Sequence, residues 1–339
     1  MNRLSVTSVT CVFLLAALLS GAGSSLAAGK LPPEKAGTIG EPTGRIAFVR
    51  DGNVWVMDHQ GQNQMKVCEV TNADGRLSWA PDGKRIAFTR SGRLELRTPD
   101  MGGGKHKLYD LFIAFIDSAM TGNLFWWNRL TDNLGSRNPE WTADGQILFT
   151  GDMNANRADA AMPNYQICLM NPDSTEVVIL REDWQTMPEF FMMPSINSKG
   201  DIAFVHFYGN KTQGIAVLPR TKFMTPLDSV KLQSIKQPNA VSPAWSPDDR
   251  WIAYINNSLD ESGIYIATPD LSESYLVFTP PAGTYPYTVA PSFSPDSKWL
   301  TFSTTDGSIW ICDITGQQPR RLSGPGFDST PAWSKAPKK

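Results

Sequence analysis

A short phrase that returns six times along the chain constrains its fold more than any other feature. Its first copy reads Trp79-Ala-Pro-Asp-Gly-Lys-Arg-Ile-Ala-Phe88, a hydrophobic anchor followed by a tight polar turn and a short apolar stretch. Further copies lie at residues 141–149, 196–204, 245–254 and 293–302, with a truncated copy at 331–334. A unit that repeats at intervals of roughly 40–60 residues indicates an architecture of stacked repeats.

The stretch 242–279 shows how one repeat is expected to fold. It contains four short apolar segments, and we expect each to form a strand: 243–245, 251–254, 263–267 and 275–278. The residues Ser246, Pro247 and Asp248 favour a type I turn between the first two strands. One such antiparallel sheet cannot bury both of its faces alone, so the copies must stack side by side. We therefore predict an all-β, six-bladed β-propeller with four antiparallel strands in each blade.

The two ends of the repeat array complement each other. Residues 45–49 read as a second strand that lacks a first, and residues 331–334 read as a first strand that lacks its successors. Pairing of these segments would complete one blade and close the ring, which removes exposed sheet edges. A β-sandwich is the alternative, but it explains neither the repeat nor the complementary ends.

The spacing of the repeats also predicts strands in the other blades. In the second blade we place the first three strands at residues 77–79, 85–88 and 94–96, with the outer strand after Lys105. An insertion in this blade contains the apolar stretch 108–117, which is compatible with a strand or with a helical turn. A second insertion, at 151–163, joins two strands of the third blade.

The N-terminal residues have the pattern of an export signal. A basic start is followed by the apolar run 11–19 and by small residues up to Ala27 and Ala28. The apolar run is too short to span a bilayer. We predict a signal peptide at 1–28, cleaved near Ala27 or Ala28, and a periplasmic or secreted mature chain without a transmembrane segment. The mature chain then divides into a linker at 29–43, the propeller at 44–334 and a basic tail at 335–339.

Composition and cysteine content exclude some classes of partner. The chain has 31 basic and 33 acidic residues, a formal net charge of −2, so nothing favours binding to nucleic acid. Cys68, Cys168 and Cys312 remain after export and allow at most one disulfide. Because they alternate with apolar neighbours, we expect buried small side chains rather than reactive thiols.

No motif for catalysis, metal binding or cofactor binding stands out in the sequence. There is no Gly-x-Ser-x-Gly elbow for a nucleophilic serine. His59, His106 and His206 fall in three different blades, without the spacing of a metal site. The glycine-rich stretch 101–105 lacks the Ser or Thr that follows the lysine of a phosphate-binding loop. We therefore assign no catalytic, metal or cofactor residues.

The anchor and turn phrase resembles the repeat of TolB-type β-propellers. The resemblance rests on residues 79–88, 245–254 and 293–302, and on the strands 54–58 and 309–313 that end in Asp. It extends from about residue 44 to 334. It implies a six-bladed propeller that binds partners in the cell envelope. The segment 29–44 is too short for the N-terminal α/β domain of TolB proteins, so the resemblance implies a propeller without that domain.

The departures from the repeat indicate where partners bind. Loops that join the second and third strands, and those that join blades, emerge on one face and carry many aromatic residues, which suit binding interfaces. We predict a monomeric scaffold that binds an envelope or extracellular protein or peptide. The alternatives are an extracellular glycan- or polymer-acting lyase or hydrolase that uses channel carboxylates, and a lectin-like module. The candidate partner-binding residues are Trp184, Phe190, Phe191, Phe207, Tyr208, Tyr285, Tyr287 and Phe327.

Overall fold

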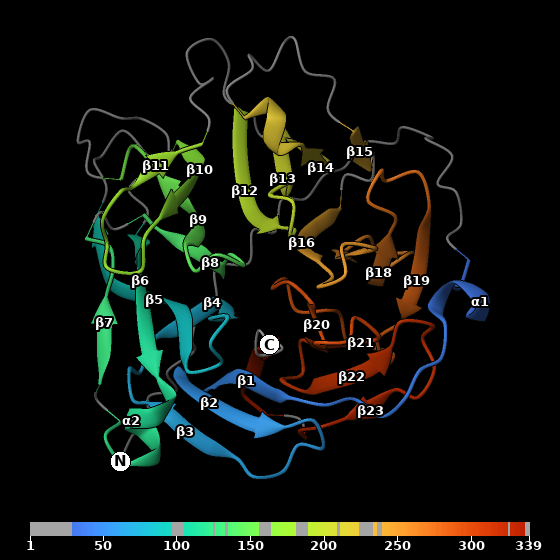
Figure 1. The fold of residues 1–339 in the computed structure, drawn as a ribbon, viewed down its shortest axis with the longest axis horizontal. Helices are drawn as coiled ribbons and strands as arrows, with labels where there is room; N and C mark the ends of the chain where they lie inside the picture. The colour runs from blue at the N-terminus through green and yellow to red at the C-terminus, as the bar shows by residue number, and fades with distance from the viewer. Residues whose placement is uncertain are drawn as a thin grey trace, which may run out of the picture.

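Six four-stranded sheets surround a central axis in the computed structural model (Figure 1). Neighbouring strands within each sheet are antiparallel. This confirms the prediction of a six-bladed β-propeller with four antiparallel strands per blade. The structure describes residues 29–96, 105–124, 126–132, 135–155, 164–180, 189–208, 211–223, 233–235, 239–324 and 326–335. The predicted signal peptide lies outside these residues.

The strands of each blade are named here from the innermost strand to the outermost. Blade 1 contains β24 (Asp328–Trp333), β1 (Arg45–Arg50), β2 (Asn53–Asp58) and β3 (Met65–Cys68). Blade 2 contains β4 (Ala73–Trp79), β5 (Arg85–Leu96), β6 (Lys105–Phe115) and β7 (Trp127–Arg129). Blade 3 contains β8 (Arg137–Trp141), β9 (Ile147–Asp152), β10 (Tyr165–Met170) and β11 (Val178–Ile179).

The remaining three blades have the same order of strands. Blade 4 contains β12 (Glu189–Ile196), β13 (Ile202–Tyr208), β14 (Lys211–Leu218) and β15 (Gln233–Ile235). Blade 5 contains β16 (Ala240–Trp245), β17 (Ile252–Asn256), β18 (Gly263–Ala267) and β19 (Ser274–Phe278). Blade 6 contains β20 (Ser292–Phe293), β21 (Trp299–Ser303), β22 (Ile309–Asp313) and β23 (Arg320–Arg321).

The alternating strand directions define two faces of the ring. The first strand of each blade lies innermost, and these strands contact one another around the axis. Turns from second to third strands and connections between blades lie on one face, which we call the upper face. The anchor residues end the inner strands at the opposite, lower face. Besides the strands there are short helices α1 (Pro33–Ala36), α2 (Ile116–Met120) and η2 (Arg220–Lys222), and no helix among the described residues is long and apolar enough to cross a membrane.

Blade 2 differs from the strand boundaries expected from the sequence. Residues 94–96 were expected as the third strand, but they belong to the long second strand β5. The third strand is β6, which pairs with β5 as far as Leu96 and Lys105, and β7 is the outer strand. The prediction is wrong because β5 continues beyond the repeat phrase instead of turning after Arg90. In the stretch 108–117 the strand β6 ends at Phe115 and the helix α2 follows it.

A repeated hydrogen bond links neighbouring blades near the axis. In three blades the serine before the anchor accepts the backbone N–H of the anchor in the next blade. Ser78 Oγ accepts from Trp141 N, Ser195 Oγ from Trp245 N, and Ser292 Oγ from Trp333 N, each over 2.9 Å. The anchors themselves form the inter-blade core, since Trp79, Trp141 and Trp333 are at most 3% exposed.

Residues 29–43, expected as a linker, pack against the outside and lower face of blades 5, 6 and 1. Leu276 N donates to Gly29 O over 3.0 Å, Trp299 Nε1 to Gly40 O over 2.9 Å, and Trp333 Nε1 to Thr43 O over 2.7 Å. Leu31 and Ala36 join the hydrophobic core that blades 5 and 6 share. This segment therefore covers the outer strand of blade 5.

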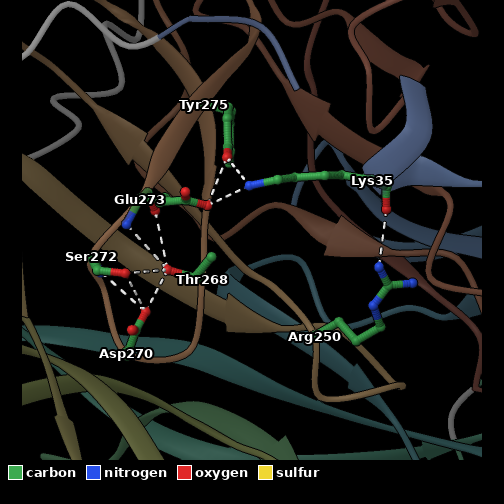
Figure 2. Close-up of polar contacts among 7 residues, drawn as sticks. All are labelled: Lys35, Arg250, Thr268, Asp270, Ser272, Glu273 and Tyr275. Atoms are coloured by element: carbon green, nitrogen blue, oxygen red, sulfur yellow. Dashed lines mark hydrogen bonds and ion pairs between the residues drawn. The ribbon is translucent and has the colours of Figure 1, made fainter. Parts of the chain in front are cut away.

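Figure 2 shows how the helix α1 is held against blade 5. Lys35 Nζ donates to Glu273 Oε2 over 2.6 Å and to Tyr275 OH over 2.7 Å. Arg250 donates through NH2 to the backbone oxygen of Lys35 over 3.0 Å. The side chains of Lys35 and Glu273 retain 40% and 49% exposure, so the contacts fix the position of the segment more than they stabilise the fold.

The three described cysteines give a first testable prediction. Cys68, Cys168 and Cys312 are buried in different blades, and none of the three forms a disulfide. Burial raises the pKa of Cys68 and Cys168 to about 12 and also raises that of Cys312. Because the thiolate is the reactive form, we expect no labelling by a thiol reagent in the native protein and full labelling in denaturant. Rapid labelling of the native protein, counted by mass spectrometry, would contradict this.

Candidate functional site

The wall of the central channel is built from bulged inner strands. In β8, β12, β16 and β24 two residues stand opposite one residue of the neighbouring strand. The first residue of each bulge has a positive φ: 55° at Asn138, 54° at Met193, 58° at Ser242 and 53° at Thr330. A proline stands two positions before the anchor in five blades, where its missing N–H suits a bulge. These prolines are Pro139, Pro194, Pro243, Pro291 and Pro331.

Blade 2 departs from this pattern by one residue. Three residues of β4, Gly75, Arg76 and Leu77, lie between the paired residues Asp74 and Ser78. The neighbouring strand β5 has only one residue in the same interval. Gly75 takes the positive φ, 68°, and a leucine replaces the proline. The bulge in β4 therefore has three residues where the other bulges have two, and Arg76 is the middle one of the three.

Arg76 connects four blades at the centre of the ring. Its NH1 atom donates to Glu140 Oε2 over 2.7 Å and to the backbone oxygen of Pro194 over 2.6 Å. Its NH2 atom donates to the backbone oxygen of Pro243. The acceptors lie on the inner strands of blades 3, 4 and 5, and Arg76 is only 7% exposed. The guanidinium therefore closes the channel to any chain that would thread it.

Glu140 completes this closure from the inner strand of blade 3. It occupies the position before the anchor where blades 2, 4 and 6 have serine. Its Oε1 atom accepts from Ser195 Oγ over 3.1 Å and from Ile196 N over 3.2 Å. Burial lowers the pKa of Arg76, and the charge of Glu140 opposes that shift. Arginine nevertheless stays protonated, because its usual pKa is above 12.

A small cavity of about 90 Å³ lies beside the Arg76–Glu140 pair. Its lining includes Arg76, Glu140, Trp245 and Lys335. Lys335 follows β24 and donates to the backbone oxygen of Trp141. Among the described residues, no group of three His, Cys, Asp or Glu side chains could hold a metal ion.

The aromatic residues expected on blade 4 lie in strands rather than in loops. Phe190 and Phe191 belong to β12, while Phe207 and Tyr208 belong to β13 and pair with β12. Their expected loop placement is wrong because both strands extend beyond the repeat phrase. Phe191 is 2% exposed and packs edge-on against Phe204, with ring centroids 5.2 Å apart. Trp184 lies outside the described residues.

Tyr285 and Phe327 lie on the upper face and flank one turn of blade 6. Tyr285 N donates to Thr305 Oγ1 over 3.1 Å, and Gly326 N donates to the backbone oxygen of Asp306 over 3.0 Å. The exposed fractions are 46% for Tyr285 and 79% for Phe327. The two aromatic side chains are thus held on either side of residues 305–306 and remain open to solvent.

Tyr287 lies deeper, on the same connection between blades 5 and 6. Its N–H donates to the backbone oxygen of Ser303 over 2.8 Å. Burial raises the pKa of Tyr287, and the negative charge of Asp74 on β4 raises it further. The part that these aromatic residues play in binding stays a prediction.

Reasoning from sequence did not identify Arg76 and Glu140, although the repeats around both residues depart from the common pattern. Leu77 stands where five repeats have proline, and Glu140 stands where three repeats have serine before the anchor. A comparison of the repeats position by position would have marked both as departures. The inserted residue before Leu77 would have been the remaining clue.

Comparison with solved structures agrees with this architecture. TolB from Acinetobacter baumannii superposes with a TM-score of 0.62 and 20% identity, over 86% of this chain and 67% of that chain. A putative TolB from Agrobacterium tumefaciens superposes with a TM-score of 0.55 and 13% sequence identity, over 85% of this chain and 90% of that chain. The tricorn protease superposes with a TM-score of 0.58 and 15% sequence identity, over 84% of this chain but only 26% of the protease chain.

These likenesses identify the fold as a six-bladed β-propeller of the TolB type. The expected resemblance to TolB-type propellers is confirmed at this level. No protein-family model matches the chain, and no curated protein matches it. At 20% identity or less, the likeness extends to the fold alone.

Proposed function

We propose that this protein is an exported, monomeric β-propeller scaffold that binds a protein or peptide partner on its upper face. The observation that carries the proposal is the exposure of Phe327 and Tyr285 around the turn at 305–306. Aromatic side chains bury a large area at a low cost in conformational entropy, so they dominate the energetics of many interfaces. The pattern at 1–28 supports export, and the TolB neighbours support a scaffold role.

The closed channel determines how such a partner would approach. A segment that threads the ring would have to displace Arg76 from its acceptors in three other blades. Loss of these bonds would leave Glu140 without its cation. The partner is therefore expected to rest on the upper rim of the ring.

The enzymatic alternative requires a channel carboxylate that is available for chemistry. The carboxylate of Glu140 is instead engaged at both oxygens, by Arg76 on one side and by Ser195 and Ile196 on the other. A general acid or base must be within hydrogen-bond reach of a substrate proton. Glu140 therefore suits a structural role, and the binding scaffold is the better-supported function.

The test is a double substitution on the upper face. Tyr285→Ser with Phe327→Ser should reduce capture of partners from an envelope fraction at least tenfold, because both apolar anchors are lost. Thermal unfolding should change little, since both side chains are exposed. Met120→Ser is the matched control, because Met120 is 69% exposed on α2, away from this turn. Equal capture by the double variant and the control would overturn the proposal.

A further inference from the structure

Residues 29–43, which we call the strap, lie in a groove along the outside and lower face of blades 5, 6 and 1. Figure 1 shows the strap in blue, running from α1 beside β19 past blade 6 to β1. None of its residues belongs to one of the six sheets, and each sheet has its four strands without it. The strap is therefore bound by the propeller rather than built into it.

The propeller holds the strap by its backbone oxygens. Five of them accept hydrogen bonds from blades 5, 6 and 1, those of Gly29, Lys35, Thr38, Gly40 and Thr43. The donors are, in the same order, Leu276 N, Arg250 NH2, Lys298 Nζ, Trp299 Nε1 and Trp333 Nε1. Every residue type offers the same backbone oxygen, so these bonds recognise the course of a chain rather than its sequence.

Two of these donors stand at the same position of the repeat. Arg250 in blade 5 and Lys298 in blade 6 each lie five positions after the anchor, and each is followed by a tryptophan. In the copies at 79–88, 141–149 and 196–204 no tryptophan follows the turn. The basic residue with its tryptophan thus marks the two full copies of the repeat that the strap crosses.

Four apolar side chains of the strap face the propeller. Leu31 and Ala36 are 3% and 4% exposed and join the core that blades 5 and 6 share. Ile39 packs against this core and against the core between blades 6 and 1, and Pro42 is buried. The side chains between these positions include exposed ones, at Lys30, Thr38, Glu41 and Thr43. The groove therefore selects for apolar residues at a fixed spacing.

Charged side chains add little that would keep the strap in place. Lys35 and Glu273, drawn in Figure 2, pair over 2.6 Å but retain 40% and 49% exposure. Exposed pairs of this kind contribute little. The link to β1 through the single residue Gly44 gives the strap an effective concentration of about millimolar at the groove. A segment of another chain with the same contacts competes once its concentration approaches that value.

We propose that this groove is a second binding site, which takes a partner segment with the apolar pattern of the strap. That pattern is an aliphatic residue, a small apolar residue five positions later, and then an aliphatic residue and a proline at intervals of three. Main-chain hydrogen bonds supply affinity, and sockets for the apolar side chains supply specificity. The strap is the internal occupant that the partner displaces. The site is separate from the upper face, so the inference does not depend on the proposed function.

Binding of a labelled peptide with the sequence 29–43 to the whole mature chain tests the inference. Leu31→Asp with Ala36→Asp opens the groove, because two carboxylates cannot be buried there without partners. Fluorescence anisotropy should give a Kd at least about tenfold lower for this opened variant than for the wild type, whose own strap competes. Lys30→Asp is the matched control: Lys30 is an exposed residue of the strap, so this variant should bind as weakly as the wild type.

Changes in the peptide and in the groove separate backbone recognition from side-chain recognition. A peptide with serine at positions 30, 38, 41 and 43 should bind the opened variant within about threefold of the original, because the replaced side chains are exposed. A peptide with Leu31→Asp should not bind. Arg250→Met with Lys298→Met in the opened variant should weaken binding roughly 3–10-fold, since two donors to backbone oxygens are lost.

The opened variant should unfold cooperatively and remain a monomer. Loss of cooperative unfolding would make the strap part of the fold and overturn the inference. Failure of the peptide to bind the opened variant, or equal binding to the wild type, would overturn it as well. Wild-type dimers that the free peptide dissociates would identify a second copy as the occupant and contradict a partner segment. None of these outcomes affects the test on the upper face, which uses Tyr285 and Phe327.

Discussion

Replacement of Arg76 by methionine is expected to lower the free energy of unfolding by about 3 kcal/mol. Removal of one partner of a buried ion pair costs about 3–5 kcal/mol, because the other charge is left uncompensated. The lower end applies to this pair, since the side chain of Glu140 retains 16% exposure. Methionine also leaves the backbone oxygens of Pro194 and Pro243 without the donor that Arg76 supplies. Urea unfolding would show the loss as a lower midpoint.

A double-mutant cycle shows whether the loss comes from the ion pair. Glu140→Gln keeps an acceptor for Ser195 and Ile196 but removes the charge. The double variant Arg76→Met, Glu140→Gln should cost about 1–3 kcal/mol less than the sum of the single variants. Arg320→Met is the matched control, because its pair with Glu41 is 35% and 68% exposed and should contribute under about 1 kcal/mol. A loss no larger than that of the control would contradict a structural role for Arg76.

The fold could be predicted from sequence because the information is local and repeated. Each anchor and turn phrase specifies two strands and the turn between them, and six copies leave little freedom in how they stack. Strand ends were less predictable, as β5 and β12 show. Both strands extend beyond the phrase because their neighbours, β6 and β13, offer matching backbone partners. Strand length there depends on pairing between segments rather than on the residues of either strand.

The contacts that Arg76 makes across the central channel could not be predicted in the same way. Arg76 is separated from Pro194 by 118 residues and from Pro243 by 167 residues. Only the curvature of the ring brings these backbone oxygens within reach of one side chain. Backbone acceptors also carry no residue signature, because any residue at those positions would offer the same oxygen. The exposed aromatic residues were partly predictable, since Tyr285 and Phe327 lie in the expected connections.

The largest effect on stability is expected from loss of the strand β24. A chain that ends at Gly324 lacks the inner strand of blade 1, which pairs with β1 through Ile46 and Ala47. Trp333, 3% exposed, contributes about 3–5 kcal/mol by the measure of large-to-small substitutions. Typical domains are stable by only about 5–15 kcal/mol, so removal of the whole strand should abolish cooperative unfolding. Near-UV circular dichroism and size-exclusion chromatography would show loss of fixed packing and association.

Association follows because β1 would present an unpaired edge. The side chains of Ile46, Ala47 and Phe48 are fully buried in the intact fold, and an exposed apolar edge recruits strands of other chains. A chain that ends at Lys335 is the matched control and should behave as the full-length protein does. A synthetic peptide with residues 326–335, added in trans, should restore part of the near-UV signal, since it supplies the missing backbone partners. If the chain ending at Gly324 unfolds cooperatively at an unchanged midpoint, β24 contributes nothing essential and the other five blades hold the ring without it.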